Sequence, residues 1–255
     1  MAEKFEETAI IIRQEEIADD IYSMWLHTDQ IAAHAKAGQF VSVYCNDGSR
    51  LLPRPISICE IDKKDGAIRL VYRVAGKGTA EFSGMHTGAQ LRIVGPLRNG
   101  FPKKEKKAFL IGGGIGIPPM LQLAKELNCE KQIVLGFRDE LFLMDEFKKQ
   151  GKVYVATEDG SAGTEGNVLD AIRENGLDAE IIYACGPMPM LRALKEYAEK
   201  NHIECWISME ERMACGIGAC LACVCQSKEK DAHSNVKNKR ICKEGPVFRA
   251  EEVEF

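Results

Sequence analysis

Two different hydrophobic patterns meet near Pro102, and they limit the fold more than any other feature of the sequence. Before Pro102, short β-type runs alternate with turn residues, which is typical of an antiparallel barrel or sandwich. After it, continuous apolar runs alternate with amphipathic segments, which is typical of a parallel sheet covered by helices on both faces. The sequence therefore predicts an α+β multidomain chain, with an antiparallel β-barrel, an α/β parallel-sheet domain and a small C-terminal module.

The barrel prediction rests on six β-type runs, at residues 9–17, 23–28, 39–45, 54–61, 67–75 and 89–97. One amphipathic segment among them, Gly78–His86, predicts a short helix. We expect the domains to span residues 1–102, 103–208 and 209–255, with the lysine-rich residues 103–107 as a solvated linker.

In the second domain, strands are expected at residues 108–112, 132–137, 152–156 and 181–186, and a last strand at 204–208 would complete the sheet. Helices are expected between them, at residues 119–127, 143–150, 167–175 and 188–200. The polar stretch 228–239 predicts a mobile loop within the C-terminal module.

Composition narrows the class of protein. The 255 residues carry a formal net charge of −4, with 45% hydrophobic and 28% charged residues, which argues against a nucleic-acid partner. No apolar run is long enough to span a bilayer, and residues 1–16 lack the pattern of a signal peptide. Ten cysteines without such a signal predict a reducing, cytoplasmic location.

Four of the cysteines stand in eleven residues, CGIGACLACVC, at 215–225. Cys215, Cys220 and Cys223 have the C-x4-C-x2-C spacing of a plant-type 2Fe-2S site, and Cys242 follows as the fourth ligand. Small residues between the first two cysteines let the backbone wrap closely around a cluster and offer N–H groups to its sulfurs.

A zinc site is the alternative use of four cysteines. Structural zinc sites usually pair two short C-x2-4-C knuckles, whereas Cys242 has no cysteine close to it in sequence, so we favour iron and sulfur. Cys225 is one thiol more than the spacing needs, and we interpret it as buried.

Glycine-rich loops follow three of the predicted parallel strands. Gly112, Gly113, Gly114 and Gly116 form a strand-to-helix turn that departs from G-x-G-x-x-G, because Ile117 stands where that pattern needs glycine. Cys185, Gly186 and Pro187 form a second turn, and residues 157–168 form a third. Because the ends of parallel strands share one sheet edge, the three loops together favour a dinucleotide site.

The order of these motifs is familiar. RPIS, VYR followed by GKGT, GGGIGIPPM and CGPMPM resemble the ferredoxin reductase superfamily, in which a flavin-binding barrel precedes a nicotinamide-binding α/β domain. The tail MEERMACGIGACLACVC…RICKEGPVF is similar to that of the electron-transfer subunits of class B dihydroorotate dehydrogenases. The resemblance covers essentially the whole chain.

The resemblance implies an FAD site in the barrel. Arg54, Pro55, Ile56 and Ser57 would hold FAD, with the arginine on the pyrophosphate and the serine near the isoalloxazine. A guanidinium suits a diphosphate because its planar fork donates two parallel bonds. The resemblance also places flavin contacts at Val71, Tyr72, Arg73, Gly78 and Thr79.

In the second domain the resemblance implies an NAD site at the glycine loops, with Cys185 near the approach of the nicotinamide to the flavin. Hydride transfer needs proximity more than acid or base chemistry, so no catalytic residue is assigned. Arg138 and Asp139 leave NAD and NADP both open by their chemistry, and NAD is implied by the resemblance alone.

The implied function is electron transfer between NAD and an FMN-containing catalytic subunit that oxidises dihydroorotate to orotate in pyrimidine (UMP) biosynthesis, in a heterotetramer with two copies of each chain. The sequence shows no group suited to that oxidation, so we assign it to the partner. Two alternatives are an NAD(P)H:ferredoxin or sulfide-type oxidoreductase subunit, and a non-enzymatic zinc-binding or redox-sensing module.

Overall fold

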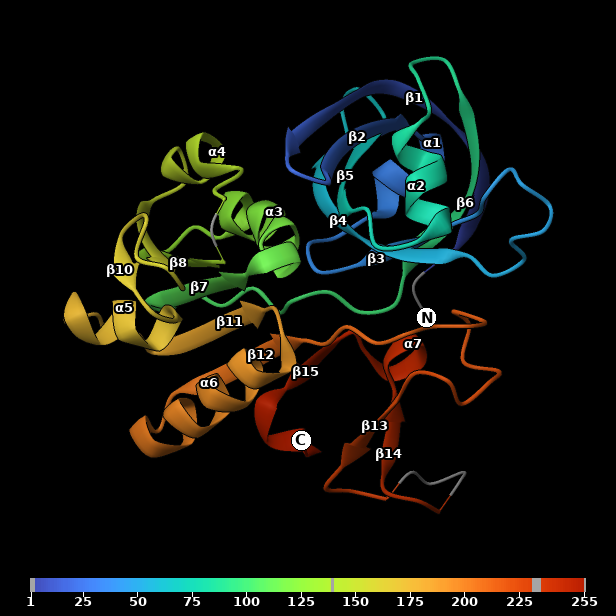
Figure 1. Cartoon of the computed structure of the whole chain (residues 1–255). Coiled ribbons are helices and arrows are strands. Elements are labelled where there is room, and N and C mark those ends of the chain that lie inside the picture. Colours follow the sequence, from blue (N-terminus) through green and yellow to red (C-terminus); the bar gives the residue numbers. More distant parts are fainter. Residues whose placement is uncertain (1–2, 139, 231–234, 255) are drawn as a thin grey trace.

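The structure is a computed structural model that describes residues 3–138, 140–230 and 235–254. The barrel and the parallel sheet lie side by side, and the C-terminal segment lies beneath both (Figure 1). The middle of the expected loop at 228–239 and Asp139 lie outside the described residues.

Six antiparallel strands close into the predicted barrel, in the order β1-β2-β5-β4-β3-β6. In β1, Ala9 and Ile11 are buried while Ile10 and Ile12 face outward, the period of two that places one side of a strand in a core. The strands are β1 (Phe5–Ala18), β2 (Ile21–His27), β3 (Phe40–Val43), β4 (Arg54–Asp62), β5 (Ala67–Arg73) and β6 (Gln90–Leu97).

Two short helices accompany the barrel. Helix α1 (Asp29–His34) was not predicted, although Thr28 gives a sequence signal for its start, because the Thr28 hydroxyl accepts a hydrogen bond from the Ala32 N–H at 3.2 Å. Helix α2 (Lys77–Ser83) was predicted to reach His86, but it ends before Gly84, a residue type that favours helix ends.

The second sheet has the strand order β10-β9-β8-β7-β11-β12-β15. All its neighbours pair in parallel as predicted, except β15. The parallel strands are β7 (Ala108–Gly113), β8 (Lys131–Phe137), β9 (Lys152–Thr157), β10 (Thr164–Glu165), β11 (Ile181–Cys185) and β12 (Glu204–Ser208).

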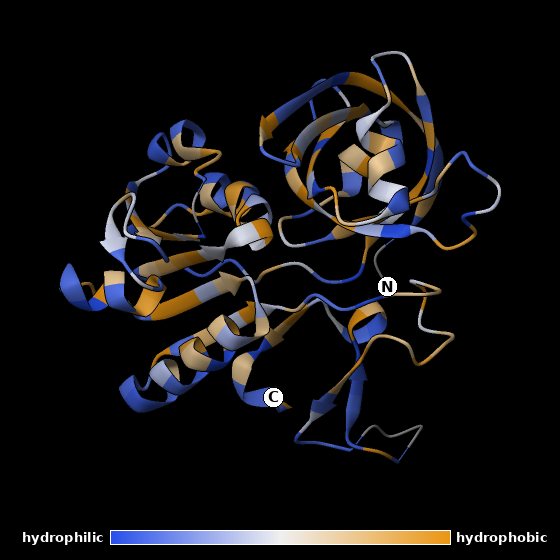
Figure 2. Cartoon of the chain, viewed as in Figure 1, coloured by the Kyte–Doolittle hydropathy of each residue, from blue (hydrophilic) through white to orange (hydrophobic). Residues whose placement is uncertain are grey.

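Alternate residues of these strands belong to two different cores. Leu110 and Tyr183 pack with helices α3 (Pro118–Glu126) and α4 (Met144–Lys148) and with residues of the barrel. Ile111 and Ala184 pack with helices α5 (Val168–Glu174) and α6 (Met188–Asn201) and with the C-terminal segment. Figure 2 shows the hydrophobic residues concentrated along these strands, so the sheet joins all three parts of the chain.

The prediction that residues 204–208 complete the sheet was wrong. Strand β15 (Val247–Arg249) returns from the C-terminal segment and pairs antiparallel with β12, with Ile207 opposite Phe248. The sequence hid this strand because it is only three residues long and follows Gly245 and Pro246. The remaining C-terminal elements are β13 (Val224–Ser227), β14 (Asn238–Arg240), α7 (Ile241–Glu244) and β16 (Val253–Glu254).

The lysine-rich linker is less solvated than predicted. The Lys104 and Lys106 ammonium groups both bond to the Glu204 carboxylate at the start of β12, the latter at 3.1 Å. Burial alone would raise the pKa of Glu204, but the bonds from Lys104, Trp206 and Lys106 lower it to about 2. The linker is therefore anchored to the sheet.

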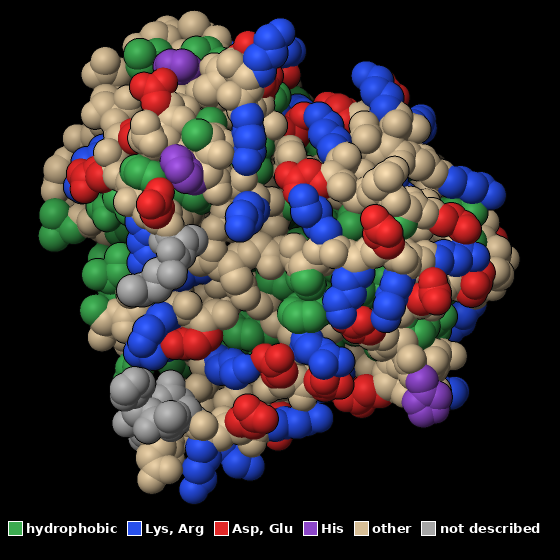
Figure 3. Space-filling view, turned by 180° about the vertical axis from the view of Figure 1, so that it is seen from behind, with side chains coloured by type: hydrophobic (Ala, Val, Ile, Leu, Met, Phe, Trp, Pro, Cys, Tyr) green, Lys and Arg blue, Asp and Glu red, His purple; other side chains and the backbone are tan. Residues whose placement is uncertain are grey.

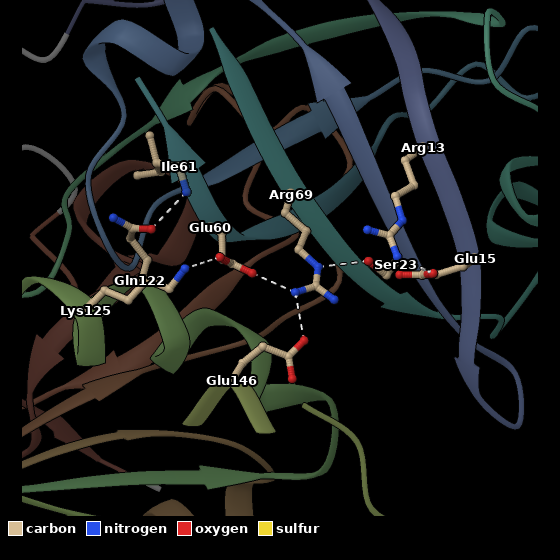
Figure 4. A network of polar contacts seen from close by, with 9 residues as sticks. All are labelled: Arg13, Glu15, Ser23, Glu60, Ile61, Arg69, Gln122, Lys125 and Glu146. Atoms are coloured by element: carbon tan, nitrogen blue, oxygen red, sulfur yellow. Dashed lines mark hydrogen bonds and ion pairs between the residues drawn. The ribbon is translucent and has the colours of Figure 1, made fainter. Parts of the chain in front are cut away.

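A buried polar network joins the barrel to α3 and α4 (Figure 4). The Arg69 guanidinium of β5 donates to Glu60 of β4 at 2.6 Å, to Glu146 of α4 at 3.2 Å and to the Ser23 hydroxyl of β2 at 2.8 Å. Lys125 of α3 also bonds to Glu60. The side chains of Arg69 and Glu60 are only 7% and 8% exposed, so the network fixes the two domains relative to each other.

Within the described ranges, the structure contains no helix that combines the length and the apolar character needed to cross a membrane.

Candidate functional site

The predicted nicotinamide residues meet at one edge of the parallel sheet. Gly112, one residue before the end of β7, lies directly opposite Cys185, which ends β11. From β7 the chain proceeds toward β8 and β9, whereas from β11 it proceeds toward β12 on the other side. This is a topological switch point, the place where open α/β sheets bind their ligands.

The two loops are packed so closely that only glycine fits. A Cβ atom on Gly116 would lie 2.5 Å from the carbonyl carbon of Cys185, and one on Gly186 would lie 3.1 Å from the backbone nitrogen of Gly113. Gly114 has φ +52° and open space beside it. No side chain caps α6, whose first turn carries the N–H groups of Met188 and Met190 at this edge. Helix α3 offers none in its first turn, because Pro118 and Pro119 have no N–H and the Met120 N–H bonds to the Ile117 carbonyl at 3.1 Å.

The third predicted loop lies at the same edge but satisfies its own polar groups. The Thr157 hydroxyl donates to the Ala162 carbonyl at 2.9 Å and accepts from the Ala162 N–H at 3.1 Å. Asn167 and Asp170 form a reciprocal cap at the start of α5. These donors are therefore used within the loop itself.

We expect Gly116→Ala to raise the KM for NADH by about tenfold and to lower the free energy of unfolding by about 1–3 kcal/mol, because the added methyl group forces two backbones apart. The matched control is Gly114→Ala, where the same atom meets open space and only the backbone is strained. Steady-state kinetics and urea unfolding measure both effects. Equal losses in the two variants would show that loop contact is not the cause.

Cys185 has a carboxylate neighbour that the sequence did not reveal. The Cys185 thiol is fully buried, and its Sγ lies 3.9 Å from Oε1 of Glu210, just after β12. Burial, with a smaller contribution from Glu210, raises the pKa of Cys185 well above its usual value. The thiol is therefore protonated at neutral pH, as expected for a residue with no nucleophilic role.

Glu210 remains in contact with water, but the surrounding protein raises the pKa of its carboxyl group by desolvation. A raised folded-state pKa means that the native state holds a proton more tightly than the unfolded chain. The stability that this group contributes is therefore present at low pH and is lost as pH rises through the folded-state pKa.

We expect Glu210→Gln to raise the Tm at pH 7–8, by no more than about 2–4 °C because water screens the charge. This gain in Tm should shrink as the pH falls toward the pKa that Glu210 has in the unfolded chain. Thermal unfolding between pH 4.5 and 8 measures it, and a gain that grows on acidification would contradict this assignment.

The predicted flavin residues lie on one side of the barrel. Arg54 begins β4, and its guanidinium crosses Gly78 of α2 so closely that a Cβ there would lie 2.0 Å from Nε. The Ser57 position pairs with Phe40 of β3. The Thr79 hydroxyl accepts hydrogen bonds from the N–H groups of Ala75 and Gly76, which shapes the turn before α2.

The predicted flavin residues of β5, Val71 to Arg73, differ in how exposed they are. Val71 and Tyr72 are each 3% exposed, whereas Arg73 at the end of the strand is exposed. Tyr72 donates to Gln14 at 3.2 Å and packs edge-on against Phe82 of α2. Tyr72 thus belongs to the barrel core, and Gly78 is buried as well. The exposed Arg73 and the half-buried Arg54 form the accessible part of the set.

The four predicted cluster ligands lie in two pairs. The Sγ atoms of Cys215 and Cys220 are 3.3 Å apart, and the Cys242 N–H lies 3.4 Å from Sγ of Cys223. The β13–β14 hairpin produces the second pair, because it places Val224 opposite Arg240 and so brings Cys242 on α7 back to Cys223.

This pairing fits a two-iron cluster better than a single ion. Each iron of a 2Fe-2S cluster takes two cysteine ligands, whereas one zinc ion draws four to a single centre. Among the residues that the structure describes, no three Cys, His, Asp or Glu side chains converge on one metal position. Cys225 stands apart from both pairs, half-buried rather than fully buried, with its Sγ 3.5 Å from the Lys239 carbonyl oxygen.

The backbone around the cluster segment is shaped for thiolates. Gly216 and Gly218 have φ +64° and +86°, which favour glycine. Burial alone would raise the pKa of Cys215, but N–H groups of Cys220, Ile217 and Ala219 lower it to about 6. The predicted wrapping of backbone donors around a sulfur is therefore present.

A nicotinamide-type loop at a switch point, an arginine-bearing barrel and a paired cysteine segment define a class of protein: a flavin-dependent pyridine-nucleotide reductase with an attached iron–sulfur domain. Comparisons with known proteins agree. Residues 110–196 match the oxidoreductase NAD-binding domain, and residues 210–254 match the iron–sulfur cluster binding domain of dihydroorotate dehydrogenase B. The second match confirms the prediction of iron and sulfur over zinc.

Relatives specify the family. The electron transfer subunit of dihydroorotate dehydrogenase B (NAD(+)) from Fusobacterium nucleatum is 43% identical over 94% of this chain and 95% of that protein. The corresponding subunit from Bacillus velezensis is also 43% identical, over 93% and 94%. The chain belongs to this family.

Solved structures show the same fold. An NADH-dependent reduced ferredoxin–NADP oxidoreductase, studied for flavin-based electron bifurcation, matches with a TM-score of 0.87 and 29% identity over 97% of this chain and 90% of that one. Phthalate dioxygenase reductase matches with a TM-score of 0.62 and 20% identity over 93% and 94%.

Proposed function

We propose that this chain carries electrons between NAD(H) and a separate catalytic subunit that interconverts dihydroorotate and orotate, using FAD and a 2Fe-2S cluster. The observation that carries the proposal is the position of the paired cysteines, on a segment held against both other domains. Asn99 after the barrel exchanges two hydrogen bonds with Val247, at 2.7 and 3.1 Å, and β15 extends the nucleotide sheet.

The residues of this chain bind and orient the FAD and the nicotinamide nucleotide. In this proposal Arg54 pairs with the FAD pyrophosphate beside Gly78, while Ser57, Val71, Tyr72, Arg73 and Thr79 shape the flavin side of the barrel. The loops at Gly112–Gly116 and Cys185–Pro187 receive the nicotinamide nucleotide, with the uncapped N-terminus of α6 facing its phosphates. The bound flavin supplies the exchange between hydride and single-electron transfer.

The cluster ligands in this proposal are Cys215 with Cys220 on one iron and Cys223 with Cys242 on the other. The residues around them are apolar and exposed: Ile217 at 58%, Leu221 at 64% and Val224 at 36%. A cluster there is useful only if a second redox centre docks against it, so we place the catalytic subunit on this surface. In the view from behind, hydrophobic side chains reach the surface at the edge where the barrel meets the C-terminal segment (Figure 3).

The partner proposed here contains FMN, and two copies of each chain form a heterotetramer in the cytoplasm. The test measures iron, sulfide and flavin in the purified chain, alone and with its partner, and then NADH-dependent reduction of orotate by the complex. A colourless protein without iron, or a complex that transfers no electrons to orotate, would overturn the proposal.

A second candidate is a subunit that couples NAD(P)H to ferredoxin, favoured by the 0.87 TM-score to an oxidoreductase of that kind. The first candidate is favoured by the 43% identity to a dihydroorotate dehydrogenase B subunit, against 29% to the ferredoxin–NADP oxidoreductase. The match of the iron–sulfur segment favours it too. Assaying the purified chain with ferredoxin and with the dihydroorotate-oxidising subunit separates the two.

A further inference from the structure

A cavity of about 470 Å³ opens where the barrel, residues 98–101 after its last strand and the C-terminal segment meet. It lies away from the glycine loops and from Arg54, and its charged lining comes from Lys4 before β1, Lys36 after α1, Arg98 after β6, and Lys243 and Glu244 of α7. Figure 1 shows α7 beneath the barrel at this junction.

The cavity is strongly cationic. Four of its lining residues carry positive charge and one carries negative charge, and the carboxylate of that one, Glu244, bonds to Arg240 at 2.8 Å. Among the described residues, neither Lys36 nor Arg98 has a carboxylate within ion-pair distance. Lys4 and Arg98 lie close enough for their positive charges to repel each other.

Arg98 carries two unusual features at once. Its backbone has φ +70°, a left-handed conformation that costs any residue except glycine. Its Nε and Nη2 atoms are buried and have no hydrogen-bond partner within the described part of the chain. Buried donors are almost always satisfied in folded proteins, so we expect these two N–H groups to bind an acceptor.

The two unpartnered donors also have a definite geometry. Nε–H and one N–H of Nη2 lie on the same edge of the planar guanidinium and point in parallel, which matches the two oxygens of a carboxylate or phosphate. We propose that this cavity binds a small oxyanion of the carboxylate or phosphate class, with Arg98 as its bidentate donor and Lys4 and Lys36 as counter-charges.

The site is distinct from the dinucleotide loops, and the inference does not rest on the proposed function. A bound oxyanion would link the N-terminal segment, the barrel and α7, which carries the cluster ligand Cys242. We therefore expect binding to raise the Tm of the whole chain.

The test is calorimetric titration of the full chain, loaded with its cofactors and saturated with NAD⁺ so that the pyrophosphate sites are occupied. Inorganic phosphate and malonate are titrated separately at constant ionic strength, to distinguish the two anion types. We expect saturable binding of at least one anion, and at least tenfold weaker binding in Arg98→Gly. Glycine readily adopts φ +70°, so this variant should fold with an unchanged or higher Tm in anion-free buffer.

Lys36→Met is the second variant and should weaken binding several-fold. Arg13→Ala is the matched control, because Arg13 is an exposed arginine on β1 outside the cavity, and it should bind as the wild type does. The proposal is overturned if neither anion saturates, or if Arg98→Gly and wild type bind with the same affinity.

Discussion

Cys220→Ser is expected to lower the rate of electron transfer from NADH to orotate in the complex by about 100-fold or more. NADH-dependent dye reduction by the flavin should continue. The Sγ of Cys220 lies 3.3 Å from that of Cys215, and in the proposed function the two bind the same iron. Serine offers a hard oxygen in place of a soft thiolate. Even the mutation of residues that only hydrogen-bond to the metal ligands typically lowers metal affinity or activity by about 10–100-fold. Iron content, visible absorption and both activities measure the effect.

Cys225→Ser is the matched control, since it removes a thiol two residues beyond Cys223 that contacts Lys239 and neither cysteine pair. It should retain iron and both activities. If Cys220→Ser lost dye reduction as severely as orotate reduction, electrons would not pass from flavin to cluster in the proposed order. If Cys225→Ser lost its iron instead, the ligand set would be wrong.

Arg69→Met is expected to lower the free energy of unfolding by about 3–5 kcal/mol, because it leaves the buried Glu60 carboxylate short of a partner. Arg69 also bonds to Glu146 of α4, so the loss falls on the contact between the barrel and the nucleotide domain. Urea unfolding of the full chain measures the loss. Fluorescence of bound FAD should report loosening of the domain contact at lower urea than in the wild type.

The double variant Arg69→Met with Glu60→Leu separates charge from packing. Replacing both partners of a buried ion pair with apolar residues is often neutral or stabilising, so the double variant should recover most of the loss. A double variant as unstable as Arg69→Met alone would mean that shape, and not the unpaired carboxylate, causes the effect.

Local patterns were enough to predict most of the fold. The six barrel runs and the strand–helix alternation after Pro102 gave the right architecture, because each element buries one face and so repeats at its own period. Strand β15 escaped prediction because three residues carry almost no periodic signal and their pairing with β12 is a long-range contact. Helix α1 escaped because it is six residues long.

The candidate site also has features that the local sequence predicts and features that depend on long-range contacts. The spacing of Cys215, Cys220 and Cys223 is local and was readable, and the spacing between Gly112 and Gly116 was readable too. The proximity of Glu210 to Cys185, the crossing of Gly78 by Arg54 and the buried donors of Arg98 depend on contacts between distant segments. Periodicity within one segment carries no information about such contacts. The assignment of individual residues to FAD and NAD stays a prediction.

The position of β15 has a consequence for how the chain can be divided. A chain cut after Ser208 would lose the partner of β12 and leave its outer row of N–H and C=O groups bare, which invites pairing with other chains. The cluster-bearing segment therefore shields the border of the nucleotide sheet from self-association as well as holding metal. We expect that residues 209–255 cannot be removed without exposing this border.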